Sequence, residues 1–165
     1  MLHSAKNTIC FKYSMACISR SAATFRIIGD DLVPDEITRL LGASATHAQK
    51  KGDKIVGKKT GNVRIARFGM WRLQASNCEP EDLDGQIRFI FDQLTDDPAV
   101  WKSFASRYKM DLFCGIFMER FNEGMELSPD SLLVLGSRGI KMALDVYGPI
   151  SDDEATTSQS GRSGV

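Results

Sequence analysis

The chain has 165 residues, of which 42% are hydrophobic and 25% are charged, and its 21 basic side chains balance 21 acidic ones. This composition is typical of one globular domain, and it excludes a collagen, a highly charged disordered chain and a helical membrane protein. No stretch approaches the roughly 20 apolar residues that a membrane-spanning helix needs. A formal charge of zero also argues against a general polyanion-binding protein, because such proteins are usually basic overall.

The cysteines and the two ends of the chain suggest where the domain lies and in which compartment. The four cysteines form no C-x-x-C pair, so we expect reduced thiols in a cytoplasmic protein and no metal site. Residues 1–21 lack acidic residues, and we predict a poorly ordered extension there; a mitochondrial presequence and a translation start at Met15 are the alternatives. The Ser-, Thr- and Gly-rich residues 151–165 predict a disordered tail. A single domain is therefore expected over residues 22–150.

The predicted domain opens with a strand and a helix. Alternation predicts a strand over residues 23–28, in which Phe25 and Ile27 point to one side. A short helix is expected from Pro34, because proline fits the first helical position and the two acids that follow suit the helix dipole. Gly42 is expected to end this helix.

A polar stretch punctuated by glycines comes next and predicts a hairpin. We expect a weak strand over residues 54–58, a turn over residues 59–62 and a firm strand over residues 63–75. Gly69 is expected to mark a bulge in the firm strand.

The second half alternates helices with two strands. Acids open a helix at residues 79–82, and a further helix is expected to start at Pro98. The strand predicted over residues 111–121 is apolar on both faces, which is typical of a strand inside a sheet. Ser128 is expected to cap the last helix, and residues 141–147 form the last predicted strand. This order predicts an α+β fold with a mostly antiparallel sheet of four to five strands and three to four helices packed chiefly on one face.

A series of short motifs follows a definite order along the chain. They are Gly29-Asp30-Asp31-Leu32, Pro34-Asp35-Glu36-Ile37, Leu41-Gly42, Thr46, Lys51-Gly52-Asp53, Gly69 with Trp71 and Leu73, Leu127-Ser128-Pro129, and Gly139-Ile140 with Leu144-Asp145-Val146-Tyr147. Through their order and spacing the chain resembles, over residues 22–148, the bacterial family DUF4279, a domain of unknown function. The resemblance implies a fold and a bacterial setting, and it supplies no catalytic residue.

The sequence offers little that points to catalysis. It contains no G-x-S-x-G, H-E-x-x-H, Walker or G-x-G-x-x-G motif, so we assign no catalytic residue and no cofactor, and we lean against an enzyme. A pocket could still form from chain segments far apart in the sequence. Its candidate residues are Asp30, Asp31, His47, Asp53, Trp71 and Asp145. Each also has a structural interpretation: turn or backbone contacts for the aspartates, a solvated loop for His47 and the core for Trp71.

The most distinctive feature of the sequence is the segregation of its charges. Residues 47–72 hold eight basic residues and one acidic residue, a net charge of +7, whereas residues 73–98 hold seven acidic residues and one basic residue, a net charge of −6. The two segments either neutralise each other as neighbours or leave the hairpin free to dock a partner or an anion. The candidate binding residues in the hairpin are Lys50, Lys51, Lys54, Lys58, Lys59, Arg64 and Arg67.

The leading functional hypothesis is a non-enzymatic protein-binding module, for which an immunity protein that neutralises a toxin is one analogy. One alternative is a small-molecule or nucleotide-binding protein with weak hydrolytic chemistry. The other is nucleic-acid binding through the basic hairpin, which is disfavoured because no recognised nucleic-acid motif occurs. No membrane partner is expected, and a free sheet edge leaves monomer and homodimer both open.

Overall fold

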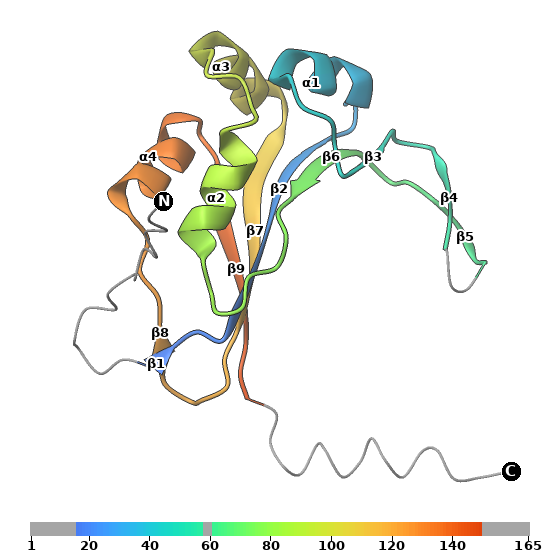
Figure 1. Ribbon diagram of the computed structural model, residues 1–165. Coiled ribbons are helices and arrows are strands. Elements are labelled where there is room, and N and C mark those ends of the chain that lie inside the picture. Colours follow the sequence, from blue (N-terminus) through green and yellow to red (C-terminus); the bar gives the residue numbers. More distant parts are fainter. Residues whose placement is uncertain (1–15, 58–60, 150–165) are drawn as a thin grey trace, which may run out of the picture.

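The computed structural model describes residues 16–57 and 61–149, which form a five-stranded sheet with four helices on one of its faces (Figure 1). Residues 1–15 of the extension predicted over residues 1–21, and the tail predicted over residues 151–165, lie outside this part of the chain. Residues 16–21 contain β1 (Ala16–Cys17) and the start of β2 (Arg20–Gly29). The domain boundary predicted at residue 22 therefore has to move toward the N-terminus.

The strands of the sheet follow the order β3-β6-β2-β7-β9, and β7–β9 is its one parallel pair. Besides β2, they are β3 (His47–Gln49), β6 (Gly69–Gln74), β7 (Lys109–Phe117) and β9 (Lys141–Tyr147). The expected α+β class with a mostly antiparallel sheet is confirmed. As its two apolar faces indicated, β7 is an interior strand, although it ends at Phe117 rather than at residue 121.

The sequence makes the starts of the four helices recognisable, through a proline at the first one and a capping side chain at the other three. The helices are α1 (Pro34–Leu41), α2 (Leu83–Phe91), α3 (Pro98–Arg107) and α4 (Pro129–Ser137). The side chains of Asp82, Asp97 and Ser128 cap α2, α3 and α4 by accepting a hydrogen bond from a backbone N–H of the first turn. The helix predicted to open at residues 79–82 therefore starts at Leu83, directly after its cap Asp82. Within residues 16–57 and 61–149, no helix has the length and apolar character needed to cross a membrane.

The prediction of one strand over residues 63–75 is wrong, because this stretch contains two strands in different sheets. β5 (Val63–Ile65) pairs with β4 (Lys54–Val56) in a separate hairpin, while β6 belongs to the main sheet. Backbone hydrogen bonds that join Ala66 to Gly52 and to Asp53, each 2.8 Å long, close the base of the hairpin. The chain therefore turns at residues 66–68 before it enters the main sheet. A second short pair, β1 with β8 (Glu123–Gly124), was not predicted.

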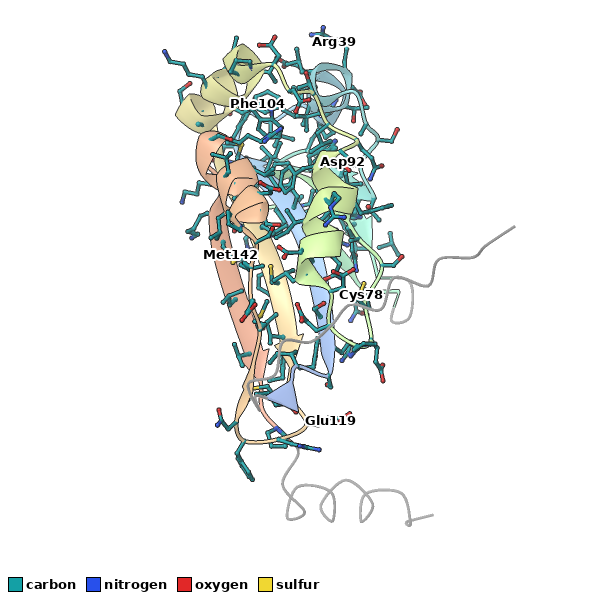
Figure 2. All side chains as sticks on the ribbon, turned by 60° about the vertical axis from the view of Figure 1, so that its left-hand side comes forward. Arg39, Cys78, Asp92, Phe104, Glu119 and Met142 are labelled. Carbon is teal, nitrogen blue, oxygen red and sulfur yellow. The ribbon has the colours of Figure 1, made fainter. Side chains whose placement is uncertain are left out.

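The core lies between the sheet and the helices. Phe25 on β2 is fully buried, and its ring contacts Trp71 of β6, Phe91 of α2 and Trp101 of α3 at centroid distances of 6.1, 5.2 and 5.9 Å. These contacts join the sheet to two helices in one aromatic cluster. Figure 2 looks onto this side of the molecule and shows the helices in front of the strands.

Gly69 starts β6 at a point where two backbone segments lie close together. A methyl group at this position would lie 2.8 Å from the carbonyl oxygen of Gly29 and 2.9 Å from Cβ of Leu32. Glycine is needed here because any side chain would collide with these segments, and not because of the bulge that the sequence suggested.

We expect Gly69→Ala to destabilise the fold by about 1–3 kcal/mol, because its methyl group has to displace backbone atoms. Gly136→Ala in α4 is the matched control, since nothing lies within 4 Å of its added methyl group and alanine favours a helix. Thermal unfolding followed by circular dichroism measures both variants. Equal melting temperatures for Gly69→Ala and the wild type would contradict the close approach.

Candidate functional site

The second face of the sheet carries no helix in the described part of the chain, and we call it the open face. Figure 1 shows the helices on one side of the sheet and the β4–β5 hairpin on the other. The strand register places one polar row across the open face, from one edge of the sheet to the other. In strand order this row contains His47, Arg72, Arg26, Asp111 and Lys141.

Arg26, at the centre of this row, already has an anionic partner. Its Nε and Nη2 atoms donate to the two carboxylate oxygens of Asp111 at 2.7 and 2.9 Å, a two-point ion pair. Its guanidinium also lies over the ring of Phe113, 4.4 Å from the ring centre. The charge of Arg26 is therefore satisfied within the sheet.

Arg72 lies directly between Arg26 and His47 and lacks such a partner. Its Nε atom is buried and has no hydrogen-bond partner among residues 16–57 and 61–149, and no acidic side chain of those residues forms an ion pair with it. Two arginines in direct cross-strand register repel each other. The open face thus carries a guanidinium whose surroundings lack the anion it prefers.

A cavity of about 410 Å³ lies at the base of the hairpin. It is lined by Gln49, Arg64, Ile65, Arg67 and Phe68. Gln49 is only 5% exposed, and its Nε2 donates to the carbonyl oxygen of Phe68 at 3.1 Å, which fixes the orientation of the amide. Its buried Oε1 has no donor within the described residues, so the cavity holds an unused acceptor. Arg64 and Arg67, both exposed, have no ion-pair partner in this same part of the chain.

The structure places Asp30, Asp31 and Asp53 of the predicted pocket in local contacts. Asp30 pairs with Lys51 at 2.5 Å, and Asp31 pairs with Arg107 at 3.3 Å. The carboxylate of Asp53 accepts a hydrogen bond of 2.7 Å from the backbone N–H three residues earlier. Only the contact of Asp53 is the backbone contact expected of the aspartates, whereas Asp30 and Asp31 form ion pairs with side chains distant in the sequence.

The remaining candidates for that pocket lie far apart. His47 lies on β3 and Asp145 on β9, the opposite edges of the sheet, four strand spacings or about 19 Å apart. Trp71 is fully buried in the core and donates from Nε1 to Thr38 Oγ1 at 3.1 Å. Of the predicted residues that the structure describes, it brings Arg64 and Arg67 together at the cavity and pairs Asp30 with Lys51, but it holds His47 and Asp145 apart.

The basic hairpin (residues 50–68) and the acidic helix α2 lie on opposite sides of the sheet (Figure 1). None of the ion pairs between described residues joins the basic segment 47–72 to the acidic segment 73–98. Lys50 and Lys54 are exposed, whereas Lys58 and Lys59 lie outside the described residues. The two charge blocks do not neutralise each other by direct pairing in this part of the chain.

Sequence reasoning missed the roles of Gln49, Phe68 and Arg26. Gln49 and Phe68 belong to the cavity only because the chain turns at residues 66–68, and Arg26 belongs to the polar row only through strand register. The alternation of polar and apolar residues along β2 is the one signal that could have assigned Arg26 to a second, uncovered face.

The described residues contain neither a cluster of metal ligands nor an activated thiol. In residues 16–57 and 61–149, no three His, Cys, Asp or Glu side chains are placed to hold a metal ion. Burial, with a smaller contribution from Asp111, raises the pKa of the Cys114 thiol to about 12. Burial also raises the pKa of Cys78, as do the nearby charges of Asp82 and Glu81. Both thiols are thus protonated at neutral pH and poor nucleophiles.

Taken together, the fold and the site define a small α+β domain with a cationic sheet face on which no described helix lies. The chain belongs to the DUF4279 family, a domain of unknown function, whose family model matches residues 18–149. The predicted family is thereby confirmed. The comparison with curated proteins found no match, and neither did the comparison with solved structures.

We expect native Cys114 to resist alkylation by iodoacetamide at neutral pH, and Cys78 to react more slowly than an unfolded cysteine, because both thiols hold their protons. Peptide mass mapping with and without denaturant measures the modification of each cysteine. Alkylation of native Cys114 as fast as in denaturant would contradict its burial.

Arg72→Met is expected to stabilise the protein by about 1–3 kcal/mol, because it removes a buried unpaired donor and a repulsive contact with Arg26 while keeping most of the side-chain volume. Arg39→Met, on the exposed surface of α1, serves as the control and is expected to change stability by less than about 0.5 kcal/mol. Urea unfolding at low salt measures both. A lower stability of Arg72→Met would show that Arg72 is satisfied in the free protein.

Proposed function

We propose that this protein is a non-enzymatic binding module that holds an acidic protein segment between its basic hairpin and the open face of its sheet. The observation that carries the proposal is the set of guanidinium groups without an acidic partner among residues 16–57 and 61–149. Arg72 lies on the open face, and Arg64 and Arg67 lie at the cavity. An arginine presents a planar set of donors that matches a carboxylate, so these three positions favour an acidic ligand.

The cavity and the open face are neighbouring parts of one surface. Gln49, at the floor of the cavity, and His47, beside Arg72, lie two residues apart on the same face of β3, a distance of about 7 Å along the strand. A ligand that reaches from Arg64 and Arg67 to Arg72 must therefore be longer than a single small anion. An extended peptide segment meets this requirement.

The uncharged groups of the cavity favour a polypeptide. The unused Oε1 of Gln49 needs an N–H donor, which every peptide unit except proline carries. Ile65 and Phe68 are 53% and 39% exposed and offer an apolar contact beside the charges. A fully ionised phosphate group has hydrogen-bond acceptors but no donor. It therefore satisfies the arginines and leaves Gln49 Oε1 without a donor.

The setting of this module follows from the same proposal. We propose a small bacterial, cytoplasmic protein that binds an acidic surface without catalysis. An immunity protein that neutralises a toxin acts in this way, and the analogy names no particular partner. Charge attraction of this kind accelerates association and weakens with salt.

The test uses fluorescence anisotropy with a labelled oligoglutamate peptide as the probe. We expect Arg64→Glu/Arg67→Glu and Arg72→Glu each to weaken its binding at least about tenfold, which is the size of a lost charge contact at an interface. Arg88→Glu on α2 makes the same charge change as Arg72→Glu, but on the exposed helix side, and is expected to leave binding nearly unchanged.

Two results would overturn the proposal. The first is equal loss of affinity in the Arg88→Glu control, which would indicate an effect of net charge alone. The second is tighter binding of a single-stranded RNA of equal charge at physiological salt, with the same dependence on Arg64, Arg67 and Arg72; the partner would then be a nucleic acid.

A further inference from the structure

β9 forms one edge of the sheet and pairs only with β7 among the described strands. The backbone N–H of Met118 donates to the carbonyl oxygen of Tyr147 at 2.9 Å, so the backbone of Tyr147 points toward β7. Because the backbone groups of a strand alternate in direction, those of Met142, Leu144 and Val146 point outward. These outward groups form a template for a further strand.

This edge lacks two of the features by which proteins protect a free strand, a proline and a bulge, although it carries the charged residues Lys141 and Asp145. β9 has seven residues in unbroken register with β7 and contains no proline. Leu144, Val146 and Tyr147 are 53%, 56% and 47% exposed. Leu132 and Leu133 of α4, which packs next to β9, are more than half exposed as well. Figure 2 shows β9 at the edge of the sheet, with Met142 on it and α4 alongside.

We propose that β9 pairs with β9 of a second copy of this chain, antiparallel and about a two-fold axis at Ala143. The outward-pointing residues must pair with one another, because they hold the free hydrogen-bonding groups. With the axis at Ala143, Met142 faces Leu144 of the second copy, and the two exchange backbone hydrogen bonds. Symmetry repeats this pair on the other side of the axis.

The charges of β9 select this register among the symmetric ones. With the axis at Ala143, Lys141 lies directly opposite Asp145 of the second copy, and the pair occurs twice. An axis at Leu144 places Lys141 opposite Tyr147, and an axis at Met142 places it opposite Ala143, so neither joins the two charges. Neither Lys141 nor Asp145 has an ion-pair partner in residues 16–57 and 61–149. The carboxylate of Asp145 accepts one hydrogen bond, from Tyr147 at 2.6 Å, and keeps capacity for a lysine.

The remaining geometry is consistent with this pairing. Lys141 and Asp145 lie on the open face, where opposed side chains of a non-hydrogen-bonded pair are closest. A two-fold axis perpendicular to the sheet keeps the helices of both copies on the same side. Leu144 then lies opposite Met142 of the second copy and Val146 lies opposite its Ile140, and the two open faces join into one.

Charge exchange tests the proposal without any ligand. We expect the wild type to sediment as a dimer in analytical ultracentrifugation. Lys141→Asp places two like-charged pairs in its own interface, and so does Asp145→Lys, so each variant is expected to dissociate at least tenfold more readily. An equimolar mixture of the two variants restores both opposite-charge pairs and is expected to form a heterodimer. Lys102→Asp on α3 changes the same charge away from β9 and is expected to remain a dimer.

Each outcome of this experiment decides the proposal. Circular dichroism first establishes that the single variants are folded. A monomeric wild type at high protein concentration would overturn the pairing. Dimers of both single variants, or a mixture that associates no better than either variant alone, would overturn the register. These results do not depend on the acidic ligand, so they separate the pairing from the proposed function.

Discussion

The contacts of Phe25 are the constraint on which the rest of the structure depends. This one ring on the central strand packs against an aromatic side chain of β6, of α2 and of α3, and so fixes two helices on the same face of the sheet. The side chains that alternate with Phe25 along β2 point to the opposite face, on which no helix of the described residues lies. The polar row of the open face is thus a consequence of where the aromatic residues lie.

The sequence was most informative where local chemistry decides the structure. Pro34, Ser128 and the acids before α2 mark helix starts that the structure confirms. The doubly apolar pattern of residues 111–121 correctly predicts an interior strand, although the strand ends at Phe117. It was least informative where distant contacts decide. The break between β5 and β6 depends on hydrogen bonds between Ala66 and residues 52 and 53, which no periodicity reveals.

The candidate site divides in the same way. Charge counting identified the hairpin arginines, because a charge block is visible in the sequence itself. It could not identify Gln49, whose importance comes from a single unused oxygen in a buried position, nor separate Arg26 from Arg72. Those two arginines have the same residue type and lie on neighbouring strands. Asp111 faces Arg26 across β2 and β7, whereas His47 faces Arg72 across β6 and β3.

The separation of the β4–β5 hairpin from the main sheet affects how the sequences of this family can diverge. Of the described residues of the hairpin, Ala66 alone is buried, so substitutions elsewhere in it disturb few core contacts. A duplicated copy of such a gene could exchange hairpin residues rapidly while its core changes slowly. Selection could then match each descendant to a different partner without rebuilding the domain.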